Sequence, residues 1–314
     1  MGSILVNMGR FNGPFVPLLR EQIPDEEVVS WPEEQPATDA EILATLSVVG
    51  ESEEGVASAL HPTVKWVHVL GAGIDAFPLD QLGDRVLTCS KGATSVPIAE
   101  YVLAVMLAYE KRIPEEWLSG PPPEWNMPQF GPLGGLAGAT LGLVGVGAIG
   151  TEVAKRALSF DMKVVAHRRS SSPMPLPEIE AASLEDVLAR ADHLVITAPS
   201  TPETYHLIGK ETLALVKPGV HLVNIARGPL VDSDALLAAL DEGRVARASL
   251  DVAEGEPLPA GHPLYDHPKV KLTPHLSNSS SRTANRTVQM FTENLARWRA
   301  GQPLQGIVDP AVGY

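Results

Sequence analysis

The segment LGLVGVGAIG, residues 141–150, decides the fold because its glycines have the spacing G-x-G-x-x-G at Gly145, Gly147 and Gly150. An apolar run precedes these glycines, and a helical pattern follows them to about residue 159. In this setting the first glycine permits a tight turn, the second lets the backbone approach a pyrophosphate, and the third lets helix and strand pack closely. The segment therefore predicts a strand, a phosphate-binding turn and a helix, as in a dinucleotide-binding unit.

The helix that starts at Ala148 and Ile149 would bind phosphate through the free N–H groups of its first turn. A glycine-rich turn without a ligand is the alternative, because the motif alone is weakly specific. A second apolar strand, which ends at His167, completes a strand–helix–strand unit and favours dinucleotide binding.

The residues after this second strand predict which dinucleotide is bound. An NAD-binding unit usually places Asp or Glu there, where the carboxylate accepts hydrogen bonds from the ribose hydroxyls. This chain has His167, Arg168, Arg169 and Ser170 instead. Because guanidinium groups bind phosphate through charge-assisted hydrogen bonds, these residues predict a 2′-phosphate site and a preference for NADPH over NADH. A solvated surface loop is the alternative.

The whole chain alternates strand-like and helix-like segments, which is the pattern of parallel α/β sheets. Its 314 residues are enough for about two domains. In the first part we expect strands at 4–8, 28–31, 47–50, 64–70 and 85–89, and helices at 15–22 and 39–46. In the second part we expect six strands of a doubly wound sheet, at 141–145, 163–167, 193–197, 220–225, 247–252 and 270–273. The remaining expected helices lie at 96–111, 148–159, 183–190, 203–216, 232–243 and 281–300.

Composition and charge exclude several classes of protein. The net charge of −14 repels polyanions, so we expect no nucleic-acid partner. The single cysteine, Cys89, excludes a disulfide framework and a multi-cysteine zinc site, and we predict no metal site. Residues 125–151 carry no charge and are long enough to span a bilayer, but their many glycines make a poor membrane helix. The first residues lack the pattern of a signal peptide, so we expect a cytoplasmic protein without membrane contact.

Three further segments place polar residues just after expected strands, at the edge where open α/β sheets bind their ligands. They contain Arg227 in NIARGPLVD, Glu256 in LDVAEGEPL and His275 in LTPHLS. Taken singly, each has an ordinary explanation: Arg227 as part of a surface ion pair, Glu256 as a solvated loop acid, and His275 as a loop histidine. Their combination is far more specific than any one of them.

Together with the glycine motif, these segments resemble the D-2-hydroxyacid dehydrogenase family, and the resemblance covers nearly the whole chain. It implies a discontinuous, flavodoxin-like substrate domain, residues 1–97 and 283–314. It implies a Rossmann dinucleotide-binding domain between them, residues 98–282.

The resemblance also implies roles for the three polar residues. His275 would be the general acid/base, Glu256 its orienting partner, and Arg227 the residue that binds the substrate carboxylate and polarises the carbonyl. The chemistry agrees with these roles, because hydride transfer to a 2-oxo acid leaves an alkoxide that an imidazolium can protonate near neutral pH. A carboxylate partner raises the histidine pKa and so favours the imidazolium.

Further site residues are implied by the same resemblance. Asp251 corresponds to the position that contacts the nicotinamide carboxamide. Other cofactor-binding residues would lie in loops that follow strands: Pro199, Thr204 and Ala226. The substrate carboxylate would be held by backbone N–H groups in the LGAGID segment, at Ala72, Gly73 and Ile74. An ordinary glycine turn is the alternative for this last segment.

Within the family, the chain most resembles short NADPH-using glyoxylate/hydroxypyruvate reductases. The resemblance implies reduction of a small anionic 2-oxo acid to the D-2-hydroxy acid, and a homodimer with the helix at 96–111 as its interface. A nucleotide-sensing corepressor or scaffold protein on the same fold is the alternative, because some relatives bind partner proteins and keep the same catalytic residues.

Overall fold

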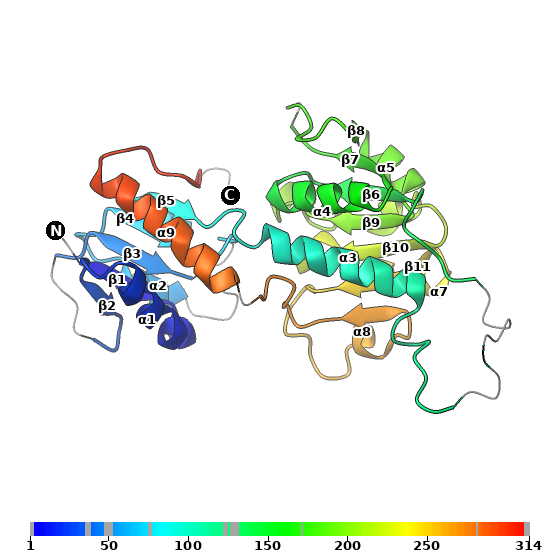
Figure 1. Ribbon diagram of the computed structural model, residues 1–314, viewed down its shortest axis with the longest axis horizontal. Coiled ribbons are helices and arrows are strands. Elements are labelled where there is room, and N and C mark those ends of the chain that lie inside the picture. Colours follow the sequence, from blue (N-terminus) through cyan, green and yellow to red (C-terminus); the bar gives the residue numbers. More distant parts are fainter. Residues whose placement is uncertain are drawn as a thin grey trace. The chain divides into compact units, whose positions relative to one another are not determined.

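A computed structural model describes residues 3–34, 39–46, 53–74, 77–121, 125, 132–170, 172–280 and 282–310. The chain forms two compact units: unit 1 is Met1–Thr94 with Ser279–Tyr314, and unit 2 is Ser95–Asn278 (Figure 1). This division lies within a few residues of the boundaries expected at 97/98 and 282/283. Each unit contains one parallel sheet, so the α/β fold class is confirmed.

Unit 1 has a five-stranded sheet in the order β2-β1-β3-β4-β5, with every pair parallel. Its strands are β1 (Ile4–Asn7), β2 (Val28–Ser30), β3 (Ile42–Thr45), β4 (Trp66–Val69) and β5 (Val86–Cys89). Its helices are α1 (Asn12–Gln22), α2 (Glu53–Ala59) and α9 (Thr283–Arg299). The strands are buried on both faces, which explains why they are short apolar runs without polar alternation.

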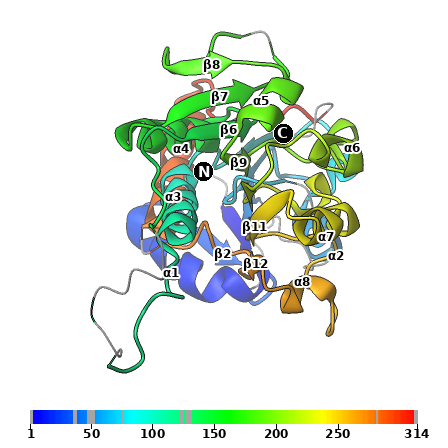
Figure 2. The ribbon, with the colours of Figure 1, turned by 90° about the vertical axis from the view of Figure 1, so that its right-hand side faces the viewer.

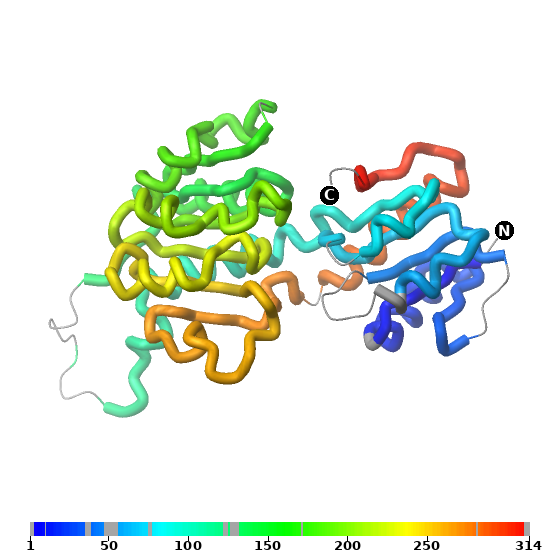
Figure 3. Tube along the Cα trace, turned by 180° about the vertical axis from the view of Figure 1, so that it is seen from behind, coloured from blue at the N-terminus to red at the C-terminus, as the bar shows by residue number. Residues whose placement is uncertain are grey.

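Helix α9, which follows unit 2 in sequence, packs on the sheet of unit 1, on the same face as α1 (Figure 1). Phe291 of α9 is fully buried and stacks on Trp66 of β4 with ring centroids 5.5 Å apart. After α9 the chain continues along β5, where Thr88 and Ile307 form an antiparallel bridge, as the red segment beside the cyan strand shows in Figure 3. The discontinuous unit is therefore held together by packing and by main-chain pairing.

The prediction of a helix at residues 39–46 of unit 1 is wrong. Residues 39–46 contain strand β3, which lies between β1 and β4. Alanine and leucine favour a helix locally, but burial between two neighbouring strands overrides this weak preference. The strand expected at 47–50 lies outside the described residues. The other expected strands and helices of this unit are present at the expected places.

Unit 2 has a seven-stranded parallel sheet in the order β12-β11-β10-β9-β6-β7-β8. Its strands are β6 (Thr140–Val144), β7 (Lys163–His167), β8 (Ile179–Ala181), β9 (His193–Ile196), β10 (Val220–Asn224), β11 (Val245–Leu250) and β12 (Val270–Leu272). Its helices are α3 (Ser95–Lys111), α4 (Ala148–Ser159), α5 (Leu184–Arg190), α6 (Lys210–Leu213), α7 (Ser233–Asp241) and α8 (Pro263–Asp266). The chain order reverses between β6 and β9, and this is the position where doubly wound sheets bind ligands beyond the carboxyl ends of their strands.

Two hydrophobic clusters cover the two faces of this sheet. Helices α3 and α4 pack on one face, and α5, α6 and α7 pack on the other (Figure 2). No helix in the described part of the chain is long and apolar enough to cross a membrane.

Two details of unit 2 differ from the expectation. The sheet has a seventh strand, β8, at its edge, which was not expected because a three-residue segment is too short to show a periodic pattern. The helix expected at 203–216 is mostly absent: the described chain there has a short 3₁₀ turn at Pro202–Thr204 and the four-residue helix α6. Gly209 separates the two, since glycine disfavours a continuous helix.

Candidate active site

The glycine turn after β6 has the geometry that its sequence predicts. Gly145 has a φ of +97°, and a Cβ there would lie 2.7 Å from the backbone nitrogen of Ala198. A Cβ on Gly150 would lie 2.8 Å from the carbonyl oxygen of Gly145. Only glycine fits at these two positions, because any side chain would press on main-chain atoms.

The remaining glycine of the motif faces open space. Gly147 precedes α4, and a Cβ on this residue would meet no atom within 4 Å, so the backbone is accessible at this point. Ala148 and Ile149 form the first turn of α4, whose N–H groups have no partner within the helix. The turn therefore offers backbone donors and room for a pyrophosphate, and it fits a dinucleotide.

Sequence reasoning missed Thr197, which supports this turn. Its Oγ1 donates a hydrogen bond of 2.7 Å to the carbonyl oxygen of Gly145, and so fixes the turn from the neighbouring strand β9. The signal was a polar residue directly after the apolar run of that strand.

The basic residues after β7 lie at the carboxyl edge of the same sheet. Nη1 of Arg168 donates a hydrogen bond of 3.1 Å to the carbonyl oxygen of Pro173, while Arg169 and Ser170 are exposed. His167 ends the strand, with Nδ1 3.4 Å from the carbonyl oxygen of Ala182. No acidic residue occurs from 167 to 170, so the strand end offers cations where an NAD site would offer a carboxylate.

One acidic side chain near this cluster was not foreseen. A hydrogen bond from Thr201 is the largest cause that lowers the pKa of Glu203, and the charge of Arg169 lowers it further. Glu203 therefore lies within electrostatic reach of Arg169.

The loop after β9 is fixed by its own hydrogen bonds. Oγ1 of Thr204 donates to the carbonyl oxygen of Pro199 over 2.8 Å and accepts from the N–H of Thr201 over 2.8 Å. These bonds give the loop one conformation at the carboxyl edge of the sheet, after the strand that neighbours β6.

The backbone around Arg227 is fixed by Asn224, the last residue of β10. The Asn224 amide donates to the carbonyl oxygen of Arg227 over 2.9 Å, and its oxygen accepts from the N–H of Ala226 over 3.1 Å. A Cβ on Gly228 would lie 2.0 Å from the carbonyl carbon of Ala253, so the Arg227 loop touches the loop that carries Glu256. Asn224 was not singled out from the sequence, although it is a polar residue at the end of an apolar strand.

His275 and Glu256 form a hydrogen-bonded pair. The Nδ1 atom of His275 donates to Oε1 of Glu256 over 2.7 Å, and Oε2 of Glu256 accepts from the N–H of Ala253 over 3.3 Å. The hydrogen bond to Glu256 is the main cause that raises the pKa of His275. Burial alone would raise the pKa of Glu256, but the hydrogen bond and the charge of His275 outweigh burial, and the pKa of Glu256 is lowered. Both shifts favour a charged pair near neutral pH.

Asp251 is buried, with 1% of its surface exposed, and its carboxylate binds the backbone around His275. Oδ1 accepts from the N–H of Leu276 and Oδ2 from the N–H of Ser277, each over 2.8 Å. Oδ1 also accepts a hydrogen bond of 2.6 Å from the hydroxyl of Thr273. Asp251, which was expected to bind the cofactor, therefore also fixes the backbone of the segment that carries His275.

The predicted substrate-binding residues lie in unit 1, after strand β4. Ala72 is exposed and Gly73 is partly exposed, while Ile74 is buried and its carbonyl oxygen accepts a hydrogen bond of 2.9 Å from the N–H of Phe77. The N–H of Ser90 donates to the carbonyl oxygen of Gly71 over 3.0 Å and so fixes the start of the segment.

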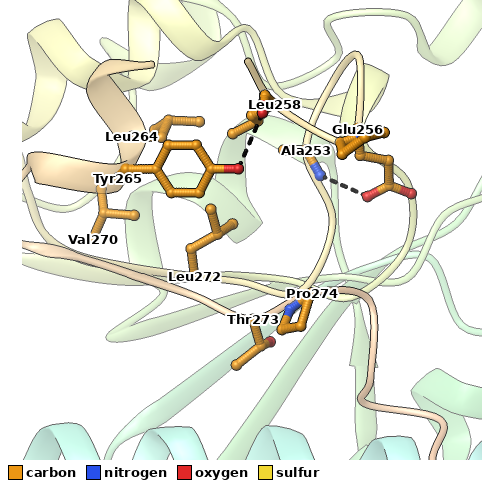
Figure 4. A pocket seen from close by; sticks show the side chains of 10 residues that line it. Ala253, Glu256, Leu258, Leu264, Tyr265, Val270, Leu272, Thr273 and Pro274 are labelled. Carbon is orange, nitrogen blue, oxygen red and sulfur yellow. Dashed lines mark hydrogen bonds between the residues drawn. The ribbon is translucent and has the colours of Figure 1, made fainter. Parts of the chain in front are cut away.

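A cavity of about 280 Å³ lies beside the loop that carries Glu256 (Figure 4). Its wall is mainly apolar, and its residues are Ala253, Glu256, Pro257, Leu258, Leu264, Tyr265, Val270, Leu272, Thr273 and Pro274. In Figure 4 the Glu256 carboxylate lies away from the Tyr265 ring, whose hydroxyl donates to the carbonyl oxygen of Leu258 over 3.2 Å. Glu256 is one of the lining residues, but its hydrogen bonds are made to His275 and to the N–H of Ala253.

Comparison with known proteins identifies the family. Residues 103–277 match the model of the D-isomer specific 2-hydroxyacid dehydrogenase, NAD binding domain. A glyoxylate reductase from Thermofilum pendens is 35% identical over 80% of this chain and 76% of its own. A glyoxylate/hydroxypyruvate reductase B from Pectobacterium atrosepticum is 34% identical over 94% of this chain and 95% of its own.

Among solved structures, a D-isomer specific 2-hydroxyacid dehydrogenase from Xanthobacter autotrophicus Py2 in complex with NADPH and MES has a TM-score of 0.83. It is 28% identical in sequence, and the match covers 100% of this chain and 99% of that one. The alternation of strands and helices and the glycine turn agree with these matches. The chain belongs to the D-isomer specific 2-hydroxyacid dehydrogenase family and is an NAD(P)-dependent enzyme of that family.

Proposed function

We propose that the protein reduces glyoxylate, hydroxypyruvate or a similarly small 2-oxo acid to the D-2-hydroxy acid, with NADPH as the hydride donor. The observation that carries this proposal is the 2.7 Å hydrogen bond between His275 and Glu256 at the carboxyl edge of a dinucleotide-binding sheet. The names of the Thermofilum and Pectobacterium relatives support the substrate class.

In this proposal the side chains of unit 2 supply the proton and the orientation. The reduced nicotinamide, when bound, supplies the hydride. His275 donates a proton from Nε2 to the developing alkoxide, because Nδ1 is occupied by Glu256. Arg227 binds the substrate carboxylate, and its positive charge is close enough to His275 to act on the histidine pKa. In unit 1, Ala72, Gly73 and Ile74 are assigned to substrate binding through their backbone N–H groups.

We assign the cofactor to the glycine turn and to the basic strand end. The N–H groups of Ala148 and Ile149 bind the pyrophosphate, for which Gly147 leaves room. Arg168 and Arg169 bind the 2′-phosphate, and the NADPH complex of the Xanthobacter structure supports this choice. Asp251, Pro199, Thr204 and Ala226, with His167 and Ser170, complete the cofactor site.

The proposal is tested by steady-state assays of a panel of 2-oxo acids with NADPH and with NADH. We expect turnover of glyoxylate or hydroxypyruvate and a higher kcat/KM with NADPH. Larger 2-oxo acids as the best substrates would overturn the substrate class. Tight NADPH binding without turnover of any 2-oxo acid would instead support a nucleotide-sensing protein.

We also propose that the protein is a cytoplasmic homodimer that associates through α3. On this helix Val96 is 43% exposed, and Trp117 and Leu118, which follow the helix in sequence, are 70% and 59% exposed. The lone, buried Cys89 suits a reducing compartment. Light scattering at micromolar concentration tests the dimer, and a monomeric mass would overturn it.

A further inference from the structure

We propose that Tyr101 and Thr273 are positioning residues, which hold the catalytic His275 in place through a chain of hydrogen bonds that ends on Asp251. The inference rests on the role proposed above for His275. We call residues 273–277 the His275 turn. Tyr101 lies on α3, far from this turn in sequence, and its hydroxyl is 2.7 Å from Oγ1 of Thr273.

The directions of the hydrogen bonds follow from what each group can donate. The Asp251 carboxylate can only accept, so the single proton of the Thr273 hydroxyl points to Asp251, 2.6 Å away. The Thr273 oxygen must then accept from Tyr101, whose hydroxyl is the donor. The same carboxylate accepts from the N–H groups of Leu276 and Ser277. Every bond in the chain therefore has one possible direction, from Tyr101 towards Asp251.

The His275 turn needs such support because its backbone is strained. His275 has a φ of +51°, a left-handed conformation that residues with a Cβ seldom adopt. Strained backbone persists only when its surroundings fix it. The N–H of His275 donates to the carbonyl oxygen of Asp251 over 2.9 Å, so the backbone and the side chain of Asp251 both hold the turn.

The Asp251 end of the hydrogen-bond chain is buried, and Tyr101 and Thr273 are partly buried. Asp251 is 1% exposed and Ser277 is 5% exposed. Burial is the main cause that raises the pKa of the Tyr101 hydroxyl. Removal of the Tyr101 donor leaves a partly buried acceptor, the Thr273 hydroxyl, without its partner.

The two ends of the hydrogen-bond chain, Tyr101 and Ser277, lie near the two places where the polypeptide passes between the units. The chain enters unit 2 at Ser95, the first residue of α3, and Tyr101 lies in the second turn of that helix. The chain leaves unit 2 at Asn278, directly after Ser277. The hydrogen bonds therefore connect the first helix of unit 2, α3, with the His275 turn, which is the last segment of unit 2.

The first test compares Tyr101→Phe with Tyr109→Phe. Tyr109 is on the same helix, and its contacts with His221 and Arg247 are made by the ring, which phenylalanine keeps. Loss of the Tyr101 hydroxyl removes one donor from the chain, so we expect kcat to fall about 2- to 10-fold. The KM for the 2-oxo acid and the affinity for NADPH should stay within about 2-fold, and the control should match the wild type.

The second measurement does not depend on activity. Hydrogen exchange of the Leu276 and Ser277 amides should become faster in Tyr101→Phe than in the wild type or in Tyr109→Phe, because their acceptor is less well fixed. Exchange in α7, which does not take part in the chain, should be unchanged. Equal exchange of the two amides in all three proteins would overturn the proposal.

The third test uses Thr273, the middle of the chain. Thr273→Ser keeps the hydroxyl and should restore near wild-type kcat, while Thr273→Val removes it and should lower kcat at least as much as Tyr101→Phe. The double variant Tyr101→Phe/Thr273→Val should be no slower than Thr273→Val alone, because both changes break one chain. Multiplied effects in the double variant would mean that the two residues act separately, which would overturn the proposal.

These outcomes are distinguishable from a failure of the proposed function. A wild-type protein that reduces none of the 2-oxo acids overturns the catalytic role of His275. Unchanged exchange of the Leu276 and Ser277 amides in an active Tyr101→Phe variant overturns only the positioning role.

Discussion

The Nδ1 atom of His275 lies 2.7 Å from Oε1 of Glu256, and this contact leaves Nε2 as the ring nitrogen that can exchange a proton with a substrate. Glu256 is itself held by the N–H of Ala253, so the orientation of the ring is set by the backbone of the loop after β11. Because the pKa of His275 is raised mainly by this hydrogen bond, the pair can supply a proton at neutral pH.

The pH dependence of reduction follows from this contact. His275 must be protonated to act as the acid, so kcat for reduction should fall as the pH rises through its raised pKa. In Glu256→Gln the negative partner is lost, the histidine pKa falls, and the decline in kcat should begin at lower pH. A pH–kcat profile of both proteins with saturating substrate checks this, and an identical alkaline midpoint would show that Glu256 does not act on His275.

The cofactor preference should depend on the two arginines after β7. If they make one or two charge-assisted hydrogen bonds to a 2′-phosphate, kcat/KM should favour NADPH over NADH by about 10- to 10,000-fold. Arg168→Ala with Arg169→Ala should raise the KM for NADPH much more than the KM for NADH. The control is Arg20→Ala, which removes an exposed ion pair with Glu34 in unit 1. An unchanged ratio in the double variant would identify the arginines as a solvated loop.

Two glycines of the motif should respond differently to alanine. In Gly150→Ala the new Cβ meets the main-chain oxygen of Gly145 at 2.8 Å, so the free energy of unfolding should fall by about 1–3 kcal/mol. In Gly147→Ala the Cβ meets nothing, so stability should be kept, while the added methyl group occupies the space proposed for the pyrophosphate. Thermal unfolding and NADPH titration of both variants separate the two effects. Wild-type NADPH affinity in a folded Gly147→Ala protein would contradict the assigned phosphate position.

Buried histidines should make the protein sensitive to mild acid. Burial lowers the pKa of His68 to about 3 and that of His193 to about 4, whereas an unfolded histidine titrates near 6.5. Between these values the unfolded chain binds more protons, so stability falls as the pH falls. At pH 5 each buried histidine should cost up to about 2 kcal/mol of unfolding free energy relative to pH 7.5.

The variant His68→Asn isolates one of these contributions, because asparagine can hydrogen-bond Thr88 without titrating. Its unfolding free energy should change less between pH 7.5 and pH 5 than that of the wild type, as measured by denaturant unfolding. The partly exposed His61, changed in the same way, is the control. An equal loss of stability in all three proteins would mean that burial of His68 has no part in the acid sensitivity.

Site residues could be predicted from the sequence where the local backbone geometry requires one residue type. The spacing of Gly145, Gly147 and Gly150 depends on one turn, and a single strand–turn–helix unit is enough to show it. His275 and Glu256 were recognised as a pair through the family resemblance, because nothing local joins two residues on separate loops.

Features that depend on long-range contacts were not predictable. Strand β3 was expected as a helix because its position between β1 and β4 is a property of the folded sheet. The hydrogen bond from Tyr101 to Thr273 joins α3 to the end of β12, and no periodic pattern in either segment indicates it. Asp251 was assigned by resemblance alone, and its bonds to the His275 turn became visible only in the structure.

The role proposed for His275 is to protonate a small 2-oxo acid during reduction by NADPH. It is tested most directly by following NADPH oxidation with glyoxylate and with hydroxypyruvate, using the wild type and His275→Ala at equal NADPH occupancy. We expect turnover by the wild type and a fall in kcat of about 100- to 10,000-fold in the variant, with NADPH affinity nearly unchanged. A wild-type kcat in His275→Ala, or no turnover of either acid by the wild type, would contradict the claim.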